Sequence, residues 1–417
     1  MSSLSEVVVP NIGSKLQPQE ALVALFDDFL RLREYSMLLA APLSEEDCVV
    51  QSMPDASPIK WHLAHTTWFF ETFVLARFEP QFSAFNSAYR YLFNSYYDAV
   101  GERHPRAQRG LLTRPAMSEV RRYRAEVEQR LQAIVLGPDY PAEGVELLQL
   151  GMQHEQQHQE LMLTDIKHLL SCNPLKPDYL PGTLIGLSVA SELCWHQFDA
   201  SVAEIGYRPA FDGEFCFDNE LPLHRQFVEP FAIASRLVSN GEYLRFVEQG
   251  GYADPAFWLA AGWDWRCSNN FVHPLYWQSA EEGEWQEFTL HGMQRLDPDA
   301  AVLHLSYFEA DAYARWVGAR LPTEAEWELA ARSVSGLRRD WFGVAWQWTS
   351  SSYAPYPGYA IAPGAVGEYN GKFMVNQYVL RGASGATPEG HARMSYRNFF
   401  PATACWQYSG IRLAQSL

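Results

Sequence analysis

Apolar residues recur at spacings of three and four through the first 171 residues, and this periodicity constrains the fold more than any other feature of the chain. The first run consists of Leu22, Leu25, Phe26, Phe29, Leu32 and Leu39. Further helical patterns cover residues 59–78, 118–134 and 142–170. A period near 3.6 residues is typical of amphipathic helices. Four helices with one long connection, residues 79–115, predict an up-and-down four-helix bundle.

The remainder of the chain has a different character. Pro and Gly punctuate residues 173–182, so a long helix cannot continue there. Short apolar stretches, Gly-containing turns and many Trp and Tyr residues follow. We expect two helices in this part, at residues 307–317 and after Thr323, which forms a capping-box pattern with Glu326. The predicted fold is multidomain, α plus α+β, with domains at residues 1–171 and 172–417.

The charge balance excludes one large class of partners. The chain has 32 Lys and Arg against 49 Asp and Glu, a net charge of -17, and contains no basic run that would neutralise phosphates. No stretch approaches the roughly 18 apolar residues that a membrane-spanning helix needs. Residues 1–15 lack the pattern of a secretory signal, and the six cysteines are scattered without C-x-x-C spacing. We expect a cytoplasmic protein that binds neither nucleic acid nor membrane.

A pair of histidines inside the fourth predicted helix indicates a metal site. His154 and His158 are four residues apart, which places both imidazoles on one face of a helix. Leu147, Gly151 and Leu161 share that stripe, so the pair points into the bundle. The alternative is a pair of core histidines that hydrogen-bond to their neighbours. Metal ligation is favoured because two adjacent buried imidazoles would be costly if protonated.

A third ligand is expected from the second helix, where His62 and His65 are both candidates and the spacing does not choose between them. Three neutral nitrogens leave coordination positions open, which suits an Fe(II) that binds substrate and O₂, although Zn with a water also fits. The segment from His154 to His158 also matches the zincin template His-Glu-x-x-His, in which Glu155 would be the general base of a zinc hydrolase. The absence of a metzincin-type extension disfavours that reading.

Several longer motifs resemble one family along nearly the whole chain. They are Leu63-Ala64-His65, residues 154–160, residues 320–328, Trp346-Gln347-Trp348 and residues 409–413. Together they resemble the iron-dependent sulfoxide synthases of ergothioneine biosynthesis, the EgtB type. The resemblance implies a DinB-like four-helix bundle followed by a C-type-lectin-like domain of the formylglycine-generating-enzyme type.

The resemblance also implies the chemistry of the site. Fe(2+) would be held by His65, His154 and His158, and the reaction would be O₂-dependent formation of a C–S bond between hercynine and a thiol, giving a sulfoxide. Tyr96 and Tyr97 resemble the tyrosine pair of the cysteine-using branch, where a phenol can donate a proton or an electron. The thiol is therefore expected to be cysteine, with γ-glutamylcysteine as the other possibility.

Residues that would bind the substrates follow from the same resemblance. Gln157 would contact the hercynine imidazole, and Asn398, Phe399 and Phe400 would lie at its amino-acid end, where aromatic rings attract a trimethylammonium group. The donor's carboxylate calls for an arginine. The candidates are Arg103, Arg106, Arg109, Arg393 and Arg397, which the sequence does not rank. Arg103 and Arg397, one from each domain, are the predicted substrate contacts.

Other functions stay open at this point. The sequence departs from the familiar motifs at Ala345, Ala383 and Ala402. A selenoneine synthase, which joins a selenosugar to hercynine, is therefore an alternative function. An ovothiol-type 5-histidylcysteine sulfoxide synthase is disfavoured because that branch usually carries an additional methyltransferase domain. Formylglycine generation is improbable because residues 393–412 lack paired cysteines. An inactive binding module is a further alternative, since fold does not dictate function.

Overall fold

The computed structural model describes residues 18–182, 191–213, 215–280, 283–333, 341–361, 367 and 369–417. The expectation about a secretory signal concerns residues 1–15, which lie outside the described residues. Among the helices in the described ranges, none combines the length and the apolar character needed to cross a membrane.

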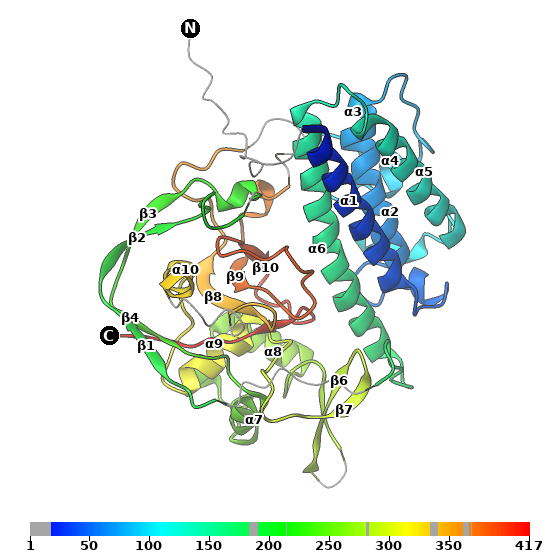
Figure 1. Ribbon diagram of the computed structural model, residues 1–417. Coiled ribbons are helices and arrows are strands. Elements are labelled where there is room, and N and C mark those ends of the chain that lie inside the picture. The colour runs from blue at the N-terminus through cyan, green and yellow to red at the C-terminus, as the bar shows by residue number, and fades with distance from the viewer. Residues whose placement is uncertain are drawn as a thin grey trace.

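Four long helices form the first domain, as predicted (Figure 1). They are α1 (Pro18–Ala40), α2 (Ile59–Phe70), α5 (Met117–Val135) and α6 (Ala142–Cys172). The predicted helix at residues 59–78 is α-helical only at its two ends, because a π-helical turn, Glu71–Leu75, separates α2 from α3 (Ala76–Phe78). Such π-helical turns are rare and frequently occur near functional sites.

Helix α2 lies inside the bundle. All 12 of its residues are buried, polar ones included, and it packs against α5 and α6. Gly151 of α6 permits the close approach of α6 to α2, since a Cβ atom at this position would clash with the rings of Phe69 and Phe70. Gly151, which lies on the stripe predicted to point inward, therefore allows the histidines of α2 and α6 to come close to one another.

The long connection between α3 and α5 is not entirely irregular. It contains the short helix α4 (Tyr89–Leu92) and a 3₁₀-helix, Arg106–Leu111. The tyrosine pair and three candidate arginines lie in this connection. Its residues contribute one wall of the cavity described below.

The second domain is built from small sheets. The largest has the order β10-β9-β8-β11, with β8 (Trp346–Ser352) antiparallel to β9 (Tyr378–Gly382) and parallel to β11 (Ser409–Gly410). Strand β10 (Asn398–Phe400) pairs with β9 at its edge. Three smaller sheets comprise β1 (Trp195–Phe198), β4 (Phe231–Ala234) and β12 (Ala414–Ser416); β2 (Ser201–Ile205) and β3 (His224–Val228); and β5 (Trp277–Ser279), β6 (Trp285–Thr289) and β7 (Gly292–Arg295).

Within the described ranges, four α-helices accompany these sheets: α7 (Asn240–Glu248), α8 (Ala260–Asn269), α9 (Tyr307–Trp316) and α10 (Glu324–Ser333). Helices α9 and α10 correspond to the two predicted ones, whereas α7 and α8 are additional. A signal for α7 was present, because Ser239 and Glu242 form the same reciprocal capping box that starts α9. The predicted architecture of a helical bundle followed by an α+β domain is confirmed.

Helix α6 joins the two domains (Figure 1). Its buried Glu160 accepts hydrogen bonds from Trp346 Nε1 at 2.7 Å and Ser384 Oγ at 2.6 Å, both in the second domain. Further along the helix, Lys167 Nζ lies 2.7 Å from His304 Nε2. One face of α6 therefore belongs to the bundle while another is bonded to the second domain, so any site on α6 lies close to both.

Candidate metal centre and adjoining cavity

Three buried histidines meet between α2 and α6. One ring nitrogen from each of His65, His154 and His158 lies within 4.8 Å of the others. His65 Nε2 and His154 Nε2 are 3.2 Å apart. His62, the other candidate from α2, does not belong to this group, because its Nδ1 contacts His158 Nδ1 and its Nε2 contacts Asp165. The packing of the helices therefore selects His65, which the spacing alone did not.

Helix α2 fixes the orientation of His65 through its own neighbours. Trp61 stacks on the imidazole with ring centroids 4.5 Å apart, and Trp68 stacks on it at 5.5 Å. Residues four before and three after share its face of the helix. His65 Nδ1 lies 2.6 Å from the carbonyl oxygen of Phe93, to which it donates. Its Nε2 is thereby left with a lone pair facing the other two histidines.

All three imidazoles are held in the neutral form. Burial lowers the pKa of His65 and of His158 well below the ordinary value, and lowers the pKa of His154 to about 3. His154 Nδ1 is buried without a hydrogen-bond partner among the described residues. Neutral nitrogens that face one another fit a metal ion better than they fit a hydrogen-bonded core. The donor set suits Fe(II) or Zn²⁺.

Glu155 does not act at this centre. Its carboxylate points into the bundle, where it pairs with Arg33 at 2.8 Å and Arg124 at 2.9 Å and accepts from Ser36 Oγ at 2.6 Å. Burial alone would raise the pKa of Glu155, but the two guanidinium groups outweigh burial and lower it to about 2. The general-base role that the zincin reading required is incompatible with this arrangement, because residue 155 lies on a different face of α6 from the histidine pair.

A cavity of about 850 Å³ lies between the two domains and reaches the histidines. His158 lines it, and the rings of His65 and His154 lie 4.8 and 4.6 Å from the ring of His158. Further lining residues from the first domain include Trp61, His62, Tyr96, Arg103, Arg106, Arg109, Gln157 and Asp165. Those from the second domain include Tyr369, Tyr396, Arg397, Asn398, Phe399, Phe400 and Trp406.

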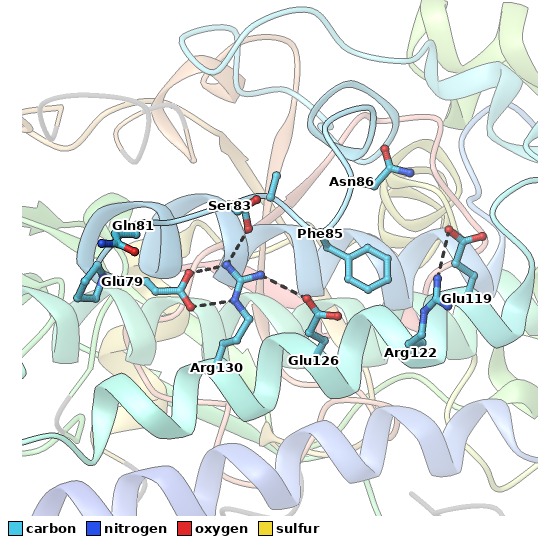
Figure 2. Close-up of a pocket in the computed structure, with 11 residues that line it drawn as sticks. Glu79, Gln81, Ser83, Phe85, Asn86, Glu119, Arg122, Glu126 and Arg130 are labelled. Atoms are coloured by element: carbon cyan, nitrogen blue, oxygen red, sulfur yellow. Dashed lines mark hydrogen bonds and ion pairs between the residues drawn. The ribbon is translucent and has the colours of Figure 1, made fainter.

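A second hollow lies on the surface of the bundle and is lined by other residues (Figure 2). Its charged side chains pair with one another: Arg130 Nε bonds Glu79 at 2.9 Å, and Arg122 lies 4.0 Å from Glu119. This hollow has no part in the predicted site.

The two adjacent tyrosines occupy different environments. Tyr97 is fully buried, with its ring 5.1 Å from that of Phe73, and is not among the described residues that line the cavity. Tyr96 stacks on Tyr97 at 4.6 Å and does line the cavity. Their hydroxyl oxygens are 3.5 Å apart. Only Tyr96 thus presents its side chain to a bound molecule directly.

A third tyrosine, which the sequence did not single out, lies beside the histidines. The ring of Tyr369 packs edge-on against His154 with centroids 5.6 Å apart. Burial raises the pKa of Tyr369 well above its ordinary value. It comes from a segment without a local motif, so only the docking of the second domain on α6 reveals it.

Gln157 is held by two tyrosines of the second domain. Its Nε2 donates to Tyr396 Oη at 2.6 Å, and its Oε1 accepts a short hydrogen bond from the Tyr369 hydroxyl. The amide is half-buried in the cavity wall, next to His158. Its orientation is consequently set before any ligand arrives.

Strand β10 carries the predicted aromatic segment. Asn398, Phe399 and Phe400 are all half-buried and line the cavity, so the two phenylalanines are not simply core residues. Phe399 stacks on Tyr353 with centroids 4.1 Å apart, and Phe400 packs edge-on against Trp406 at 6.0 Å. Together these rings form an aromatic wall opposite the bundle.

Two of the five candidate arginines are committed to internal partners. Arg393 pairs with the buried carboxylate of Glu220 and is not among the described residues that line the cavity, so it is removed from the candidates. Arg397 lines the cavity, but its N–H groups are bonded to Glu324 and to the carbonyls of Asn219 and Ala354. The predicted contact by Arg397 would require most of these bonds to break.

The connecting segment supplies the other three. Arg103 is 46% exposed and lies 3.2 Å from Asp98, and Arg106 is exposed and bonds the carbonyl of Asp55. Arg109 differs, because it is 5% exposed and donates to Ser57 Oγ at 2.9 Å. In the described part of the chain its Nε has no hydrogen-bond partner and no ion pair within 4.0 Å is found for it, although the more distant carboxylate of Asp165 acts to raise its pKa. A buried guanidinium of this kind is suited to an anionic ligand.

Residues 28–162 match the DinB superfamily, and residues 202–341 match the sulfatase-modifying factor enzyme 1-like domain. Among curated proteins, the chain is 30% identical to the hercynine oxygenase of Mycolicibacterium thermoresistibile, over 87% of this chain and 88% of the relative. It is 29% identical to the hercynine oxygenase of Mycobacterium tuberculosis, over 87% of this chain and 91% of the relative.

Matches to proteins of the formylglycine-generating type involve part of the chain. The formylglycine-generating enzyme of Streptomyces coelicolor is 33% identical over 33% of this chain and 48% of the relative. Among solved structures, PvdO from Pseudomonas aeruginosa covers 54% of this chain and 94% of its own, with 18% identity and a TM-score of 0.33. The likeness to the two mycobacterial proteins, in contrast, extends over both domains.

Proposed function

Because the chain belongs to the hercynine oxygenase family, the EgtB-type sulfoxide synthases, we propose that it joins hercynine to cysteine in an O₂-dependent reaction at an iron held by His65, His154 and His158. The observation that carries the proposal is the convergence of three neutral, buried imidazoles beside a cavity that both domains line. Bound Fe(II) would supply the redox chemistry with O₂ that C–S bond formation and sulfoxidation require.

The second domain and Gln157 would bind hercynine. The amide of Gln157, preset by two tyrosines, faces the cavity next to His158 and is placed to hydrogen-bond an imidazole there. The aromatic wall of Phe399 and Phe400 is suited to the trimethylammonium group through cation–π attraction, worth about 0.5–2 kcal/mol. Asn398, at the start of the same strand, offers its amide to the substrate's carboxylate.

Arg109 would bind the carboxylate of the sulfur donor, with Arg103 and Arg106 nearer the exposed surface. Burying an unpaired guanidinium costs free energy, which an anionic ligand recovers. A selenosugar offers no carboxylate for this position. Arg109 thus favours an amino-acid thiol over a selenosugar as the donor. The choice of cysteine over γ-glutamylcysteine rests on the Tyr96-Tyr97 pair alone.

Tyr96 would handle protons at the reacting atoms. Its side chain lines the cavity, and the hydroxyl of Tyr97 lies 3.5 Å behind it. A phenol that is connected to a second phenol can deliver a proton and be restored by its neighbour.

The test is a product assay by mass spectrometry. Full-length protein loaded anaerobically with Fe(II) would receive hercynine and O₂ with cysteine, γ-glutamylcysteine or a selenosugar in separate reactions. A hercynyl–cysteine sulfoxide is expected in the first reaction, and none with Zn-loaded protein. Product only with the selenosugar would overturn the assigned donor. No product with any donor, from protein that retains zinc but not iron, would overturn the proposed function.

A further inference from the structure

His62 is buried between a histidine of the metal site and a carboxylate. Its Nδ1 lies 2.8 Å from His158 Nδ1, and its Nε2 lies 3.0 Å from Asp165 Oδ2. The side chain of His62 is 2% exposed and that of Asp165 is 6% exposed. His158 and Asp165 lie seven residues, about two turns, apart on α6, and His62 of α2 connects them.

Hydrogen-bond chemistry determines where each proton in this line resides. An ionised carboxylate only accepts, so the Nε2 of His62 must carry a proton and donate it to Asp165. The contact between the two Nδ1 atoms needs one proton, which belongs either to His158 or to a doubly protonated His62. Only in the first case does His158 keep a lone pair on Nε2 that can bind a metal. A ligand role for His158 therefore requires that His158 donates its Nδ1–H to His62.

We infer that His62 and Asp165 are positioning residues that hold His158 in the tautomer and orientation needed to bind the metal through Nε2. This inference rests on the metal centre of the proposed function. Hydrogen bonds from a ligand imidazole to an acceptor behind it fix the ring and raise its basicity, and their loss typically weakens metal binding by about 10- to 100-fold.

The surroundings of the pair support this role. Asp165 is itself anchored, because its Oδ2 also accepts from the backbone N–H of Ser57 at 2.8 Å. Of the other two ligands, His65 donates its Nδ1–H to a backbone carbonyl and not to a side chain, and the Nδ1 of His154 has no hydrogen-bond partner in the described part of the chain. A side-chain relay thus supports only one of the three, namely the ligand that lines the cavity and would meet incoming substrate.

The experiment measures metal affinity in the full-length apoprotein by anaerobic competition for Fe(II) with a chromogenic chelator. His62→Leu removes the acceptor of the His158 Nδ1–H at nearly constant side-chain size. The Kd of this variant for Fe(II) is expected to be roughly 10- to 100-fold higher than that of the wild type. His62→Asn retains an acceptor oxygen for His158 Nδ1–H and is expected to recover most of that loss. His168→Leu is the matched control, because His168 lies on α6 with His158 and Asp165 but bonds Ser52 Oγ at 2.8 Å instead.

A spectroscopic measurement separates positioning from a general loss of structure. The visible absorption of the Co(II)-loaded protein is expected to change in His62→Leu and to remain unchanged in His168→Leu. An unaltered Kd and Co(II) spectrum in a folded His62→Leu protein would overturn the inference. If that variant does not fold, ¹⁵N NMR of the Zn-loaded wild type decides: a proton on Nδ1 of His62, with or without one on Nε2, would overturn the inference, and a proton on Nε2 alone would support it.

These outcomes differ from failure of the proposed function. A wild-type protein that binds no Fe(II), or that binds Fe(II) but forms no product, contradicts the proposed function. A wild-type protein that binds Fe(II) tightly, with an affinity that His62→Leu leaves unchanged, contradicts the role of His62 alone.

Discussion

The guanidinium carbon of Arg109 lies 3.3 Å from the ring centroid of Trp61, and the imidazole of His65 stacks on the same indole with ring centroids 4.5 Å apart. Trp61 and His65 are one turn apart on α2, whereas Arg109 comes from the segment that connects α4 to α5. A single indole therefore separates a cation without an acidic partner from a candidate metal ligand. A carboxylate bound by Arg109 would place the rest of a small thiol donor beside the histidines.

Arg109→Gln tests this arrangement. Loss of charge-assisted hydrogen bonds worth about 1.5–3 kcal/mol is expected to raise KM for the thiol roughly 10- to 100-fold, with little change in KM for hercynine. Steady-state kinetics with each substrate varied separately provides the measurement. Arg122→Gln is the control, because Arg122 is 70% exposed and lies outside the cavity. Equal increases for both substrates would contradict the assignment of Arg109 to the donor.

The tyrosine pair should divide its roles. Because Tyr96 lines the cavity and Tyr97 lies behind it, Tyr96→Phe is expected to lower sulfoxide formation by about 100-fold or more, with unchanged Fe(II) affinity. Tyr97→Phe is expected to retain iron and to lower sulfoxide formation less, with some diversion to thiol oxidation. The ratio of sulfoxide to disulfide product measures both effects. A larger loss in Tyr97→Phe would reverse the two roles.

Glu155→Gln should affect stability and not metal binding. The change leaves two buried arginines with a neutral partner, and breaking buried pairs of this kind costs about 3–5 kcal/mol. Urea unfolding measures the loss, and a chelator titration measures Fe(II) affinity. The control is Glu143→Gln on the same helix, whose side chain is 52% exposed in a surface pair with Arg77. Activity lost at full stability would instead revive a catalytic role for Glu155.

Gly151→Val should separate α6 from α2. The added side chain would clash with the rings of Phe69 and Phe70, and such overpacking costs about 1–3 kcal/mol. Because His65 and His154 are brought together by the same contact, Fe(II) affinity is expected to fall along with the melting temperature. Gly385→Ala, where a Cβ would meet only the carbonyl oxygen of Gly343 at 3.6 Å, is the control. Unchanged metal affinity in the valine variant would show that the two helices adjust independently.

Lys167 predicts a pH dependence of stability. Burial lowers the pKa of its ammonium group from 10.5 to about 8 in the folded protein. Between these two pH values the unfolded chain binds the proton more strongly than the folded protein does, so the free energy of unfolding rises with pH. Relative to Lys167→Met, the wild type is expected to gain about 3 kcal/mol from pH 8 to pH 10.5. The prediction is contradicted if the free energies of unfolding of the wild type and of Lys167→Met, measured by urea unfolding, change in parallel from pH 8 to pH 10.5.

Local spacing accounts for much of what the sequence could predict. The four helices of the bundle followed from a period that persists over many turns, and the pairing of His154 with His158 followed from their separation of four residues, about one turn, within one helix. Longer motifs indicated the family and the second domain. Helices α7 and α8 were not predicted. Of the two, α7 begins with a local signal, the capping box of Ser239 and Glu242, whereas α8 begins without a side-chain cap.

The tertiary structure decided the rest. Whether His62 or His65 joins the histidine pair depends on how α2 crosses α6, which Gly151 and Phe70 determine by contact and not by spacing. The ion pairs of Glu155 with Arg33 and Arg124 also join residues that are far apart in the chain. The same holds for the ring contact between Tyr369 and His154. A helix sets the directions of its own side chains, but which distant groups meet those side chains depends on the packing of several elements at once.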